Sequence, residues 1–394
     1  MLNMAISNTY KAGKHFLQIP GPTNIPDRIL RAMDAPTIDH RGPQFAALSK
    51  SVLERIKLIF KSTDPVVIYP SSGTGAMEAS LVNTLNEGDK IIMFETGEFA
   101  RQWCQTAERF KINVDYVPGD WRTGADPNIV KEKLLADKKN EIKAVLVTHN
   151  ETSTGIKSRV EEIRKAIDET NHPALFMVDT ISSLGSYNYE HQKWKVDVTV
   201  AGSQKGLMLP PGLSFNAISN KALEAYKNSK MPKSYFDWGQ MLENNKSGFY
   251  PYTPATNLLY GLNESIDMLQ EEGLDNVFER HKRLADATRL TVEAWGLEIL
   301  AKNPIERSDS ITAIMVPDGH DSDNLRKIIY DNYNMSLGTG LNKVKSKVFR
   351  IGHLGDLNEL SLMGALAGIE MGLKQSGIPY KTGGIMAAID FLSS

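Results

Sequence analysis

Short runs of apolar residues alternate in the first two thirds of the chain with stretches in which apolar residues recur every three or four positions. An apolar run of four to eight residues indicates a buried strand, and the longer periodic stretches indicate amphipathic helices. Parallel strands covered by helices on both faces produce this alternation. We therefore predict an α/β fold with a mostly parallel central sheet. The predicted strands are Val66–Tyr69, Lys90–Phe94, Lys143–Thr148, Ala174–Val178 and Val196–Ala201.

The pattern changes after about Gly273. Val277–Ala294 has the period of one long, charged helix, and two apolar runs, Ser310–Val316 and Lys347–Ile351, indicate strands. A further helix is predicted near Ser361–Lys374, which completes a smaller α+β unit. The predicted organisation is an N-terminal arm over residues 1–18, a large domain over 19–273 and a small C-terminal domain over 274–394.

Composition narrows the classes of function. A length of 394 residues suits two or three domains. The net charge of −2 gives no overall attraction to nucleic acid or to anionic membranes, and no run approaches the roughly 20 apolar residues of a membrane span. A single cysteine, Cys104, argues against a disulfide framework. We therefore expect a cytoplasmic protein whose partners are small molecules rather than nucleic acid or membrane.

Each predicted strand of the large domain ends in small or polar residues. The five segments read SSGTG, ETGE, HNETSTG, DTISS and GSQKG. In open α/β sheets, ligands bind outside the carboxyl ends of the strands, so these segments predict a site at that edge. The alternative is that serine, threonine and glycine are ordinary loop residues.

Two charged residues stand at these strand ends. Lys205 follows an apolar strand, where a lysine is costly unless its ammonium is paired or its amine takes part in chemistry. A lysine amine can form a Schiff base with pyridoxal phosphate (PLP). Asp179 ends the preceding strand, and a carboxylate there can keep the pyridine nitrogen of PLP protonated. A solvated loop lysine and a metal-binding or helix-capping aspartate are the alternatives.

The SSGTG segment lies between a strand and a helix that we expect to begin near Ala76. A helix N-terminus offers free N–H groups and the positive end of the dipole to a phosphate. Glu78 stands where a dinucleotide fingerprint would have its third glycine, and no Gly-Lys-Ser/Thr follows. The segment is therefore a weak signal by itself.

Longer motifs are more specific. They are PGPTNIPDRILRAM, GTGAMEASLVNTL, HNETSTG, MVDTISSLG, GSQKGLMLPPG, YFDW, FYPYTP, LLYGL, GLDNVFERH and KVFRIGHLGDLNELSL. With these motifs, nearly the whole chain resembles the class V aminotransferases, which are fold-type I PLP-dependent transferases. Within that class it is most similar to the serine–glyoxylate aminotransferases. The resemblance implies transfer of an amino group from L-serine to glyoxylate, and a homodimer or a tetramer.

The resemblance also implies roles for individual residues. Lys205 matches the Schiff-base lysine and Asp179 the partner of the pyridine nitrogen. Arg350 matches the arginine that binds the substrate α-carboxylate, which a planar guanidinium can do with two parallel hydrogen bonds. An interdomain salt bridge is the alternative for Arg350. The other implied contacts are Ser72, Gly73, Thr74 and Gln204 with the phosphate, Thr152 with the phenolic oxygen, Phe99 with the ring face, and Tyr250 and Thr253 with the phosphate of the neighbouring subunit.

Departures from the family pattern keep other functions open. Met77 stands where relatives often carry tryptophan, and Ala100-Arg101 stands where several carry Ser-His. These positions leave alanine or aspartate as alternative amino donors. A cysteine desulfurase would need Cys104 as a nucleophile on a mobile loop, whereas a helix is expected there. A non-enzymatic PLP-fold binding protein is the alternative from another class.

The histidines, among them His40, His149 and His353, show no metal-ligand spacing. We expect them to be structural, and we expect no metal.

Overall fold

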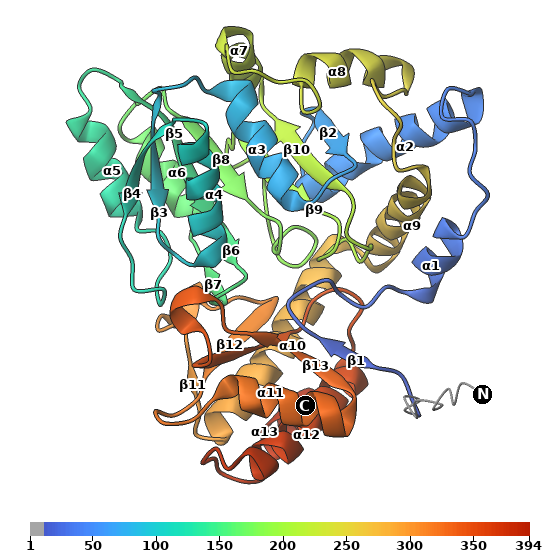
Figure 1. Cartoon of the computed structure of the whole chain (residues 1–394), viewed down its shortest axis with the longest axis vertical. Coiled ribbons are helices and arrows are strands. Elements are labelled where there is room, and N and C mark those ends of the chain that lie inside the picture. Colours follow the sequence, from blue (N-terminus) through green and yellow to red (C-terminus); the bar gives the residue numbers. More distant parts are fainter. Residues whose placement is uncertain (1–11) are drawn as a thin grey trace, which may run out of the picture.

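The computed structural model describes residues 12–394, and its centre is a seven-stranded sheet with the order β2-β10-β9-β8-β5-β3-β4 (Figure 1). Strand β10 runs antiparallel to both of its neighbours, and the other neighbouring strands pair in parallel. The predicted α/β fold with a mostly parallel sheet is confirmed. The strands are β2 (Val66–Tyr69), β3 (Lys90–Phe94), β4 (Asn113–Val117), β5 (Ile142–Thr148), β8 (Leu175–Asp179), β9 (Val198–Gly202) and β10 (Ser214–Ile218).

Two of these strands, β4 and β10, were not predicted from the sequence. β4 is the edge strand, and only Val117 of its five residues is fully buried, so it has no apolar run to detect. β10 is fully buried but carries Asn216, whose side-chain amide donates to the carbonyl of Ala76 at 3.2 Å. A polar side chain that finds its partner only in the folded protein interrupts the apolar pattern on which the prediction rests.

Helices cover both faces of this sheet, and successive strand residues enter different cores. In β5, for example, Val145 and Val147 pack into one core, and Ala144 and Leu146 into the other. One face is covered by α2 (Pro43–Phe60), α5 (Pro127–Ala136), α6 (Val160–Asp168) and α9 (Thr256–Glu272), and the other by α3 (Gly73–Thr84), α4 (Glu98–Arg109), α7 (Asn220–Asn228) and α8 (Trp238–Ser247).

A second sheet, with the order β1-β13-β14-β12-β11, forms the C-terminal part of the molecule (Figure 1). Its first strand comes from the other end of the chain, because β1 pairs in parallel with β13. The elements are β1 (Phe16–Gln18), β11 (Glu298–Ile299), β12 (Ile311–Met315), β13 (Met335–Thr339), β14 (Val348–Gly352), α10 (Leu274–Ala294), α11 (Ser322–Tyr333), α12 (Glu359–Ser376), α13 (Ile385–Leu392), and the 3-10 helices η1 (Pro304–Glu306) and η2 (Asn342–Val344).

Part of the predicted arm, residues 1–11, lies outside the described residues, and the arm ends in β1 of the C-terminal sheet. The chain then passes to the large sheet through α1 (Asp27–Met33). A short hairpin of β6 (Asn150–Glu151) and β7 (Ile156–Lys157) follows β5. The domain boundaries at residues 18 and 273 stay a prediction. Among residues 12–394, no helix has the length and apolar character needed to span a membrane.

Candidate active site

Lys205 lies in the loop after β9 and is almost completely buried. Its Nζ donates a hydrogen bond to the carbonyl oxygen of Pro20, and a Cβ on Gly21 would overlap the lysine side chain. Burial, followed by the positive charge of Arg350, lowers the pKa of Lys205 to about 7. Near neutral pH a large share of the amine is therefore unprotonated, as a nucleophile or general base requires.

Asp179 ends β8, the parallel neighbour of β9, and 3% of it is exposed. Its Oδ1 accepts a hydrogen bond from the backbone N–H of Ile181 at 2.8 Å. The pKa of Asp179 is raised to about 7, chiefly by burial and also by Glu151, against the lowering effects of the Ile181 hydrogen bond and of Lys205. A buried carboxylate with so few donors is stabilised when a cationic ligand group lies beside it.

The SSGTG segment differs from the prediction in one respect, because α3 begins at Gly73 and not near Ala76. Ser72 is the N-cap residue, and Thr74 lies in the first turn; both side chains are exposed. A Cβ on Gly73 would overlap the side chain of Ile181, so the turn packs directly against the loop that follows Asp179. The first N–H groups of α3 lack helical partners and can bind an anion.

Gln204 lies beside this helix end. Its Oε1 is buried and has no hydrogen-bond partner among the described residues. A Cβ on Gly202 would lie 3.0 Å from that oxygen and 3.7 Å from Cα of Gly73. A buried acceptor without a partner is satisfied when a ligand, or a group ordered by a ligand, donates a hydrogen bond to it.

Arg350 comes from the other sheet, in β14, and 6% of it is exposed. Its Nη1 donates to the carbonyl oxygen of Thr152 at 2.6 Å, and its Nε donates to that of Thr339 at 2.8 Å. Burial lowers the pKa of Arg350 to about 10, so the guanidinium stays charged at neutral pH. Within residues 12–394 no carboxylate pairs with it, which disagrees with the alternative of an interdomain salt bridge.

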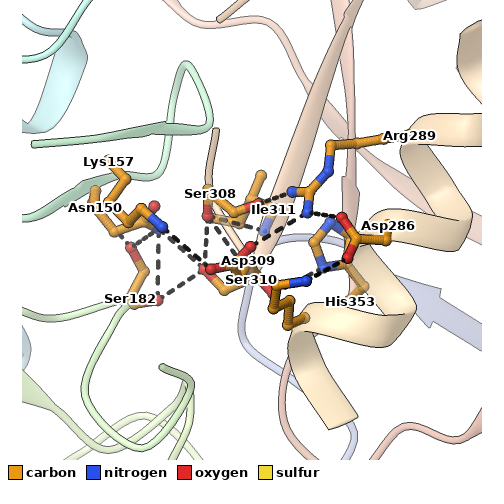
Figure 2. Close-up of polar contacts among 11 residues, drawn as sticks. Asn150, Lys157, Ser182, Asp286, Arg289, Ser308, Asp309, Ser310, Ile311 and His353 are labelled. Carbon is orange, nitrogen blue, oxygen red and sulfur yellow. Dashed lines mark hydrogen bonds and ion pairs between the residues drawn. The ribbon is translucent and has the colours of Figure 1, made fainter. Parts of the chain in front are cut away.

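Thr152 connects the large sheet to the C-terminal part. Its hydroxyl donates to Ser182 Oγ at 2.7 Å, and Asn150 Nδ2 donates to the same oxygen at 2.7 Å and to Ser310 Oγ at 3.1 Å. Ser310 Oγ in turn donates to the carbonyl of Ser182 at 3.0 Å. Figure 2 shows Asn150 and Ser182 on one side of this contact and Ser310 on the other.

Charged residues surround the same contact (Figure 2). Asp309 lies 3.2 Å from Lys157 of β7 and 3.3 Å from Arg289 of α10. Arg289 also pairs with Asp286 at 2.5 Å. His353 Nδ1 is 3.2 Å from the carbonyl oxygen of Asp309, and burial lowers the pKa of His353 to about 3, so it is neutral. This network holds the sheet that carries Arg350 against the sheet that carries Lys205.

Phe99 lies half-buried in the first turn of α4, and its backbone N–H donates to Glu151 Oε1 at 3.3 Å. Glu151 is fully buried and had no role predicted from the sequence. The detectable signal was a carboxylate directly after an apolar strand, in HNETSTG, where a charge is costly without partners.

Tyr250 and Thr253 are not brought to this site within one chain. Tyr250 packs edge-on against Phe45 of α2, with ring centroids 6.0 Å apart, and Thr253 is exposed. In the part of the chain that the structure describes, neither residue has a hydrogen bond to Lys205, Asp179 or Arg350. Their implied contact across a subunit interface stays a prediction.

The cysteine and the histidines considered as candidates have no part in the proposed chemistry. Cys104 is buried in α4, and burial raises the pKa of its thiol to about 12, so the thiolate needed by a desulfurase does not form at neutral pH. His149 is buried with its Nδ1 3.0 Å from Ser183 Oγ, and His40 is partly exposed. Residues 12–394 contain no group of three or more His, Cys, Asp or Glu side chains that could hold a metal ion.

Comparison with known proteins agrees with this geometry. The chain is 48% identical over 391 residues to the serine–glyoxylate aminotransferase of Methylorubrum extorquens, covering 98% of this chain and 97% of that protein. It is 43% identical over 371 residues to the L-aspartate–glyoxylate aminotransferase of Paracoccus denitrificans, covering 94% of each. The crystal structure of pyridoxamine–pyruvate aminotransferase from Mesorhizobium loti superimposes with a TM-score of 0.91 at 24% identity, over 98% of this chain and 99% of that one.

The family model of the class-V aminotransferases matches residues 15–351, which include Lys205, Asp179 and Arg350. The chain therefore belongs to the class-V aminotransferase family.

Proposed function

We propose that this protein is a PLP-dependent aminotransferase that moves the amino group of L-serine to glyoxylate, giving hydroxypyruvate and glycine. The observation that carries the proposal is a buried lysine with a pKa of about 7 that interacts with the charges of Asp179 and of Arg350, a guanidinium that no carboxylate among residues 12–394 pairs with. The identity to the Methylorubrum protein over almost the whole chain supports serine and glyoxylate as the substrates.

The residues present fit PLP. The first turn of α3, with Ser72, Gly73 and Thr74, and the side-chain N–H groups of Gln204 would hold the phosphate. Asp179 would hold the pyridine nitrogen, Phe99 would pack on the ring, and Thr152 would bind the phenolic oxygen. Bound PLP supplies an electron sink next to the substrate Cα.

The protein's own groups then have distinct tasks. Arg350 binds and orients the α-carboxylate of the donor and of glyoxylate. Lys205 Nζ would be the attachment point of the cofactor. When it is free, it takes the proton from the Cα of the donor and, in the second half of the reaction, delivers a proton to the Cα of the product amino acid. Pro20 and Gly21 pack against the lysine and limit the access of water to its Nζ.

Two departures from the family pattern bear on the choice of donor. Arg101 is bound by both oxygens of Glu98, at 2.9 and 2.6 Å, so it is engaged and not free to take the second carboxylate of aspartate. Met77 is 2% exposed and packs into the core between α3 and the sheet. The engagement of Arg101 favours a donor with one carboxylate. The Paracoccus relative is the reason to keep aspartate as an alternative, with alanine as the other.

Assembly and location are part of the proposal. A homodimer, alone or within a tetramer, would let Tyr250 and Thr253 reach the phosphate of the neighbouring subunit. A cytoplasmic location is proposed from the sequence. A non-enzymatic binding protein of the same fold is the alternative, and it would show no turnover and no absorbance band near about 400 nm from lysine-bound PLP.

The test is a donor screen with glyoxylate as the acceptor, comparing kcat/KM for serine, alanine and aspartate. We expect serine to give the highest value and aspartate the lowest. A higher value for aspartate would contradict the argument from Arg101 and Glu98, and turnover with none of the three would remove the proposed activity.

A further inference from the structure

Glu151 is a buried carboxylate that the proposed chemistry does not use. It has no exposed surface, and each of its hydrogen-bond partners is a donor. These are the backbone N–H groups of Phe99 at 3.3 Å, Ala100 at 3.0 Å and Ser153 at 3.0 Å, and the hydroxyl of Ser153 at 2.7 Å. Burial raises the pKa of Glu151, and these donors oppose that shift, because they suit the ionised, acceptor-only form of a carboxylate.

The strand that carries Glu151 lies between the two parts of the site. Successive side chains of β6 point in opposite directions. Asn150 points to Ser182 and Ser310, as Figure 2 shows, and Glu151 points to the first turn of α4. Gly97 precedes α4, and a Cβ there would overlap the side chain of Glu151. The position of the carboxylate is therefore fixed by close packing as well as by its hydrogen bonds.

Glu151 is also close to the substrate clamp. The residue after it, Thr152, accepts the hydrogen bond from Arg350 Nη1 at 2.6 Å. Within the described residues, Glu151 and Arg350 form no direct ion pair, so the carboxylate acts on the guanidinium through space. Its negative charge raises the pKa of Arg350, against the burial that lowers it. In a site with little water, such an interaction is strong compared with one at the surface.

We propose that Glu151 is a positioning residue whose negative charge stabilises the Arg350 guanidinium and at the same time weakens its affinity for the substrate carboxylate. This inference rests on the proposed function, in which the clamp binds donor and glyoxylate in turn. The entering amino acid and the departing keto acid carry the same carboxylate. A clamp that held it too tightly would slow the exchange of one for the other, so a repulsive charge next to the clamp favours product release.

The test is the affinity of the holoenzyme for glycolate, a monocarboxylate that has no amino group to transfer, measured by calorimetry at pH 7.5. Glu151→Gln keeps the shape and removes the charge, whereas Glu151→Asp keeps the charge and shortens the reach to α4. We expect the glycolate Kd to fall about three- to tenfold in Glu151→Gln and to stay the same or rise in Glu151→Asp. A purely structural role predicts weaker binding in both variants, so an unchanged or raised Kd in Glu151→Gln overturns the inference.

Arg350→Ala separates this inference from the proposed function. If that variant binds glycolate as the wild type does, the clamp itself is wrong, and the inference falls with it. If Arg350→Ala loses glycolate while Glu151→Gln binds it like the wild type, only the role of Glu151 is wrong.

A second variant covers the case in which Glu151→Gln shows no cooperative thermal unfolding. Ser153→Ala removes the donor at 2.7 Å and so makes the carboxylate easier to protonate. Its glycolate affinity should then rise more steeply than that of the wild type between pH 7.5 and 6. An equal pH dependence contradicts the inference.

Discussion

Lys205 and Arg350 come from different sheets and are buried to the same extent, with 6% of each residue exposed. Burial lowers both pKa values, to about 7 for Lys205 and to about 10 for Arg350. Because the guanidinium starts from a higher value, it stays charged at neutral pH, whereas a large share of the lysine loses its proton. One physical cause thus leaves an amine that readily loses its proton at the end of one sheet and a charged guanidinium on the other.

The two positions also differ in how they are held. Lys205 and Asp179 follow adjacent parallel strands of one sheet, so their proximity is a consequence of local pairing. Arg350 is brought to them only by the contacts between the two parts of the molecule, among them the bond to the Thr152 carbonyl and the network of Figure 2. In the proposed mechanism, the groups that carry the chemistry therefore lie at one sheet, while binding of the substrate carboxylate depends on how the second sheet packs against it.

Replacement of the lysine should have the largest effect. Lys205→Ala and Lys205→Arg should both lower kcat for serine and glyoxylate by at least about 10³-fold, because neither side chain offers an amine that can lose its proton near pH 7. The cofactor should still bind non-covalently. Turnover and the absorbance spectrum check this, and near-normal turnover in either variant would falsify the assignment of Lys205.

Replacement of the arginine should come next. Arg350→Ala should cost roughly 3–5 kcal/mol of transition-state stabilisation, the usual loss when one partner of a desolvated charge pair is removed. Arg350→Lys keeps the charge but loses the planar guanidinium that can form two parallel hydrogen bonds to a carboxylate. The KM values for serine and for glyoxylate should therefore rise together. Steady-state kinetics with each substrate varied in turn measure both. If only one KM rises, the two substrates use different anchors.

The carboxylate in the lysine's own sheet should have an intermediate effect. Asp179→Asn should lower kcat by roughly 10²-fold, with a smaller loss of PLP affinity, because the pyridine nitrogen loses the partner that keeps it protonated. The measurement is kcat beside the PLP dissociation constant. A variant that keeps most of its kcat would make Asp179 a structural residue.

A smaller effect is expected from the residue assigned to the neighbouring subunit. Tyr250→Phe removes one hydrogen bond to the phosphate, about 1.5–3 kcal/mol when the acceptor is charged. PLP affinity of the wild type should therefore fall at protein concentrations where the dimer dissociates, and the variant should show less of this dependence. Full affinity in a monomer contradicts the shared site.

The smallest effect concerns stability without the cofactor. The pKa of Lys205 is about 7 in the folded protein and about 10.4 when unfolded, so the unfolded chain binds more protons between these values. Stability should thus rise from pH 7 to 9 with a slope of up to about 1.4 kcal/mol per pH unit and fall as pH drops toward 7. Lys205→Met should lose this slope.

Arg350→Met is the matched control, because the pKa of Arg350 lies at about 10, above the measured range. Its stability should still rise with pH, but over a window shifted to higher pH, because loss of the Arg350 charge raises the pKa of Lys205. Urea unfolding at several pH values measures both variants, and equal slopes in wild type and Lys205→Met would mean that the buried lysine does not titrate in this window.

Residues whose role depends on one strand end could be found from the sequence. Lys205, Asp179 and the segment Ser72–Thr74 each follow an apolar run, and parallel strands bring their carboxyl ends to one edge. The boundaries were less accurate where polar residues belong to an element, as at Gly73, which is the first residue of α3 rather than part of a loop. Short-range patterns do not distinguish a glycine in a first helical turn from one in a turn outside the helix.

By itself, then, the sequence determined the α/β class, the strands of the central sheet with long apolar runs, and the positions of an amine and a carboxylate at its edge. These features could be predicted because local runs of apolar residues indicate which segments form buried strands. Only the tertiary structure decided that β1 completes the C-terminal sheet, that Arg350 reaches Thr152, and that Glu151 is buried against α4. These contacts join residues far apart in the chain, between positions 16 and 335, 152 and 350, and 100 and 151. The tertiary structure also decided the pKa values of about 7 for Lys205 and about 10 for Arg350, because they follow from how much water the folded chain excludes around each charge.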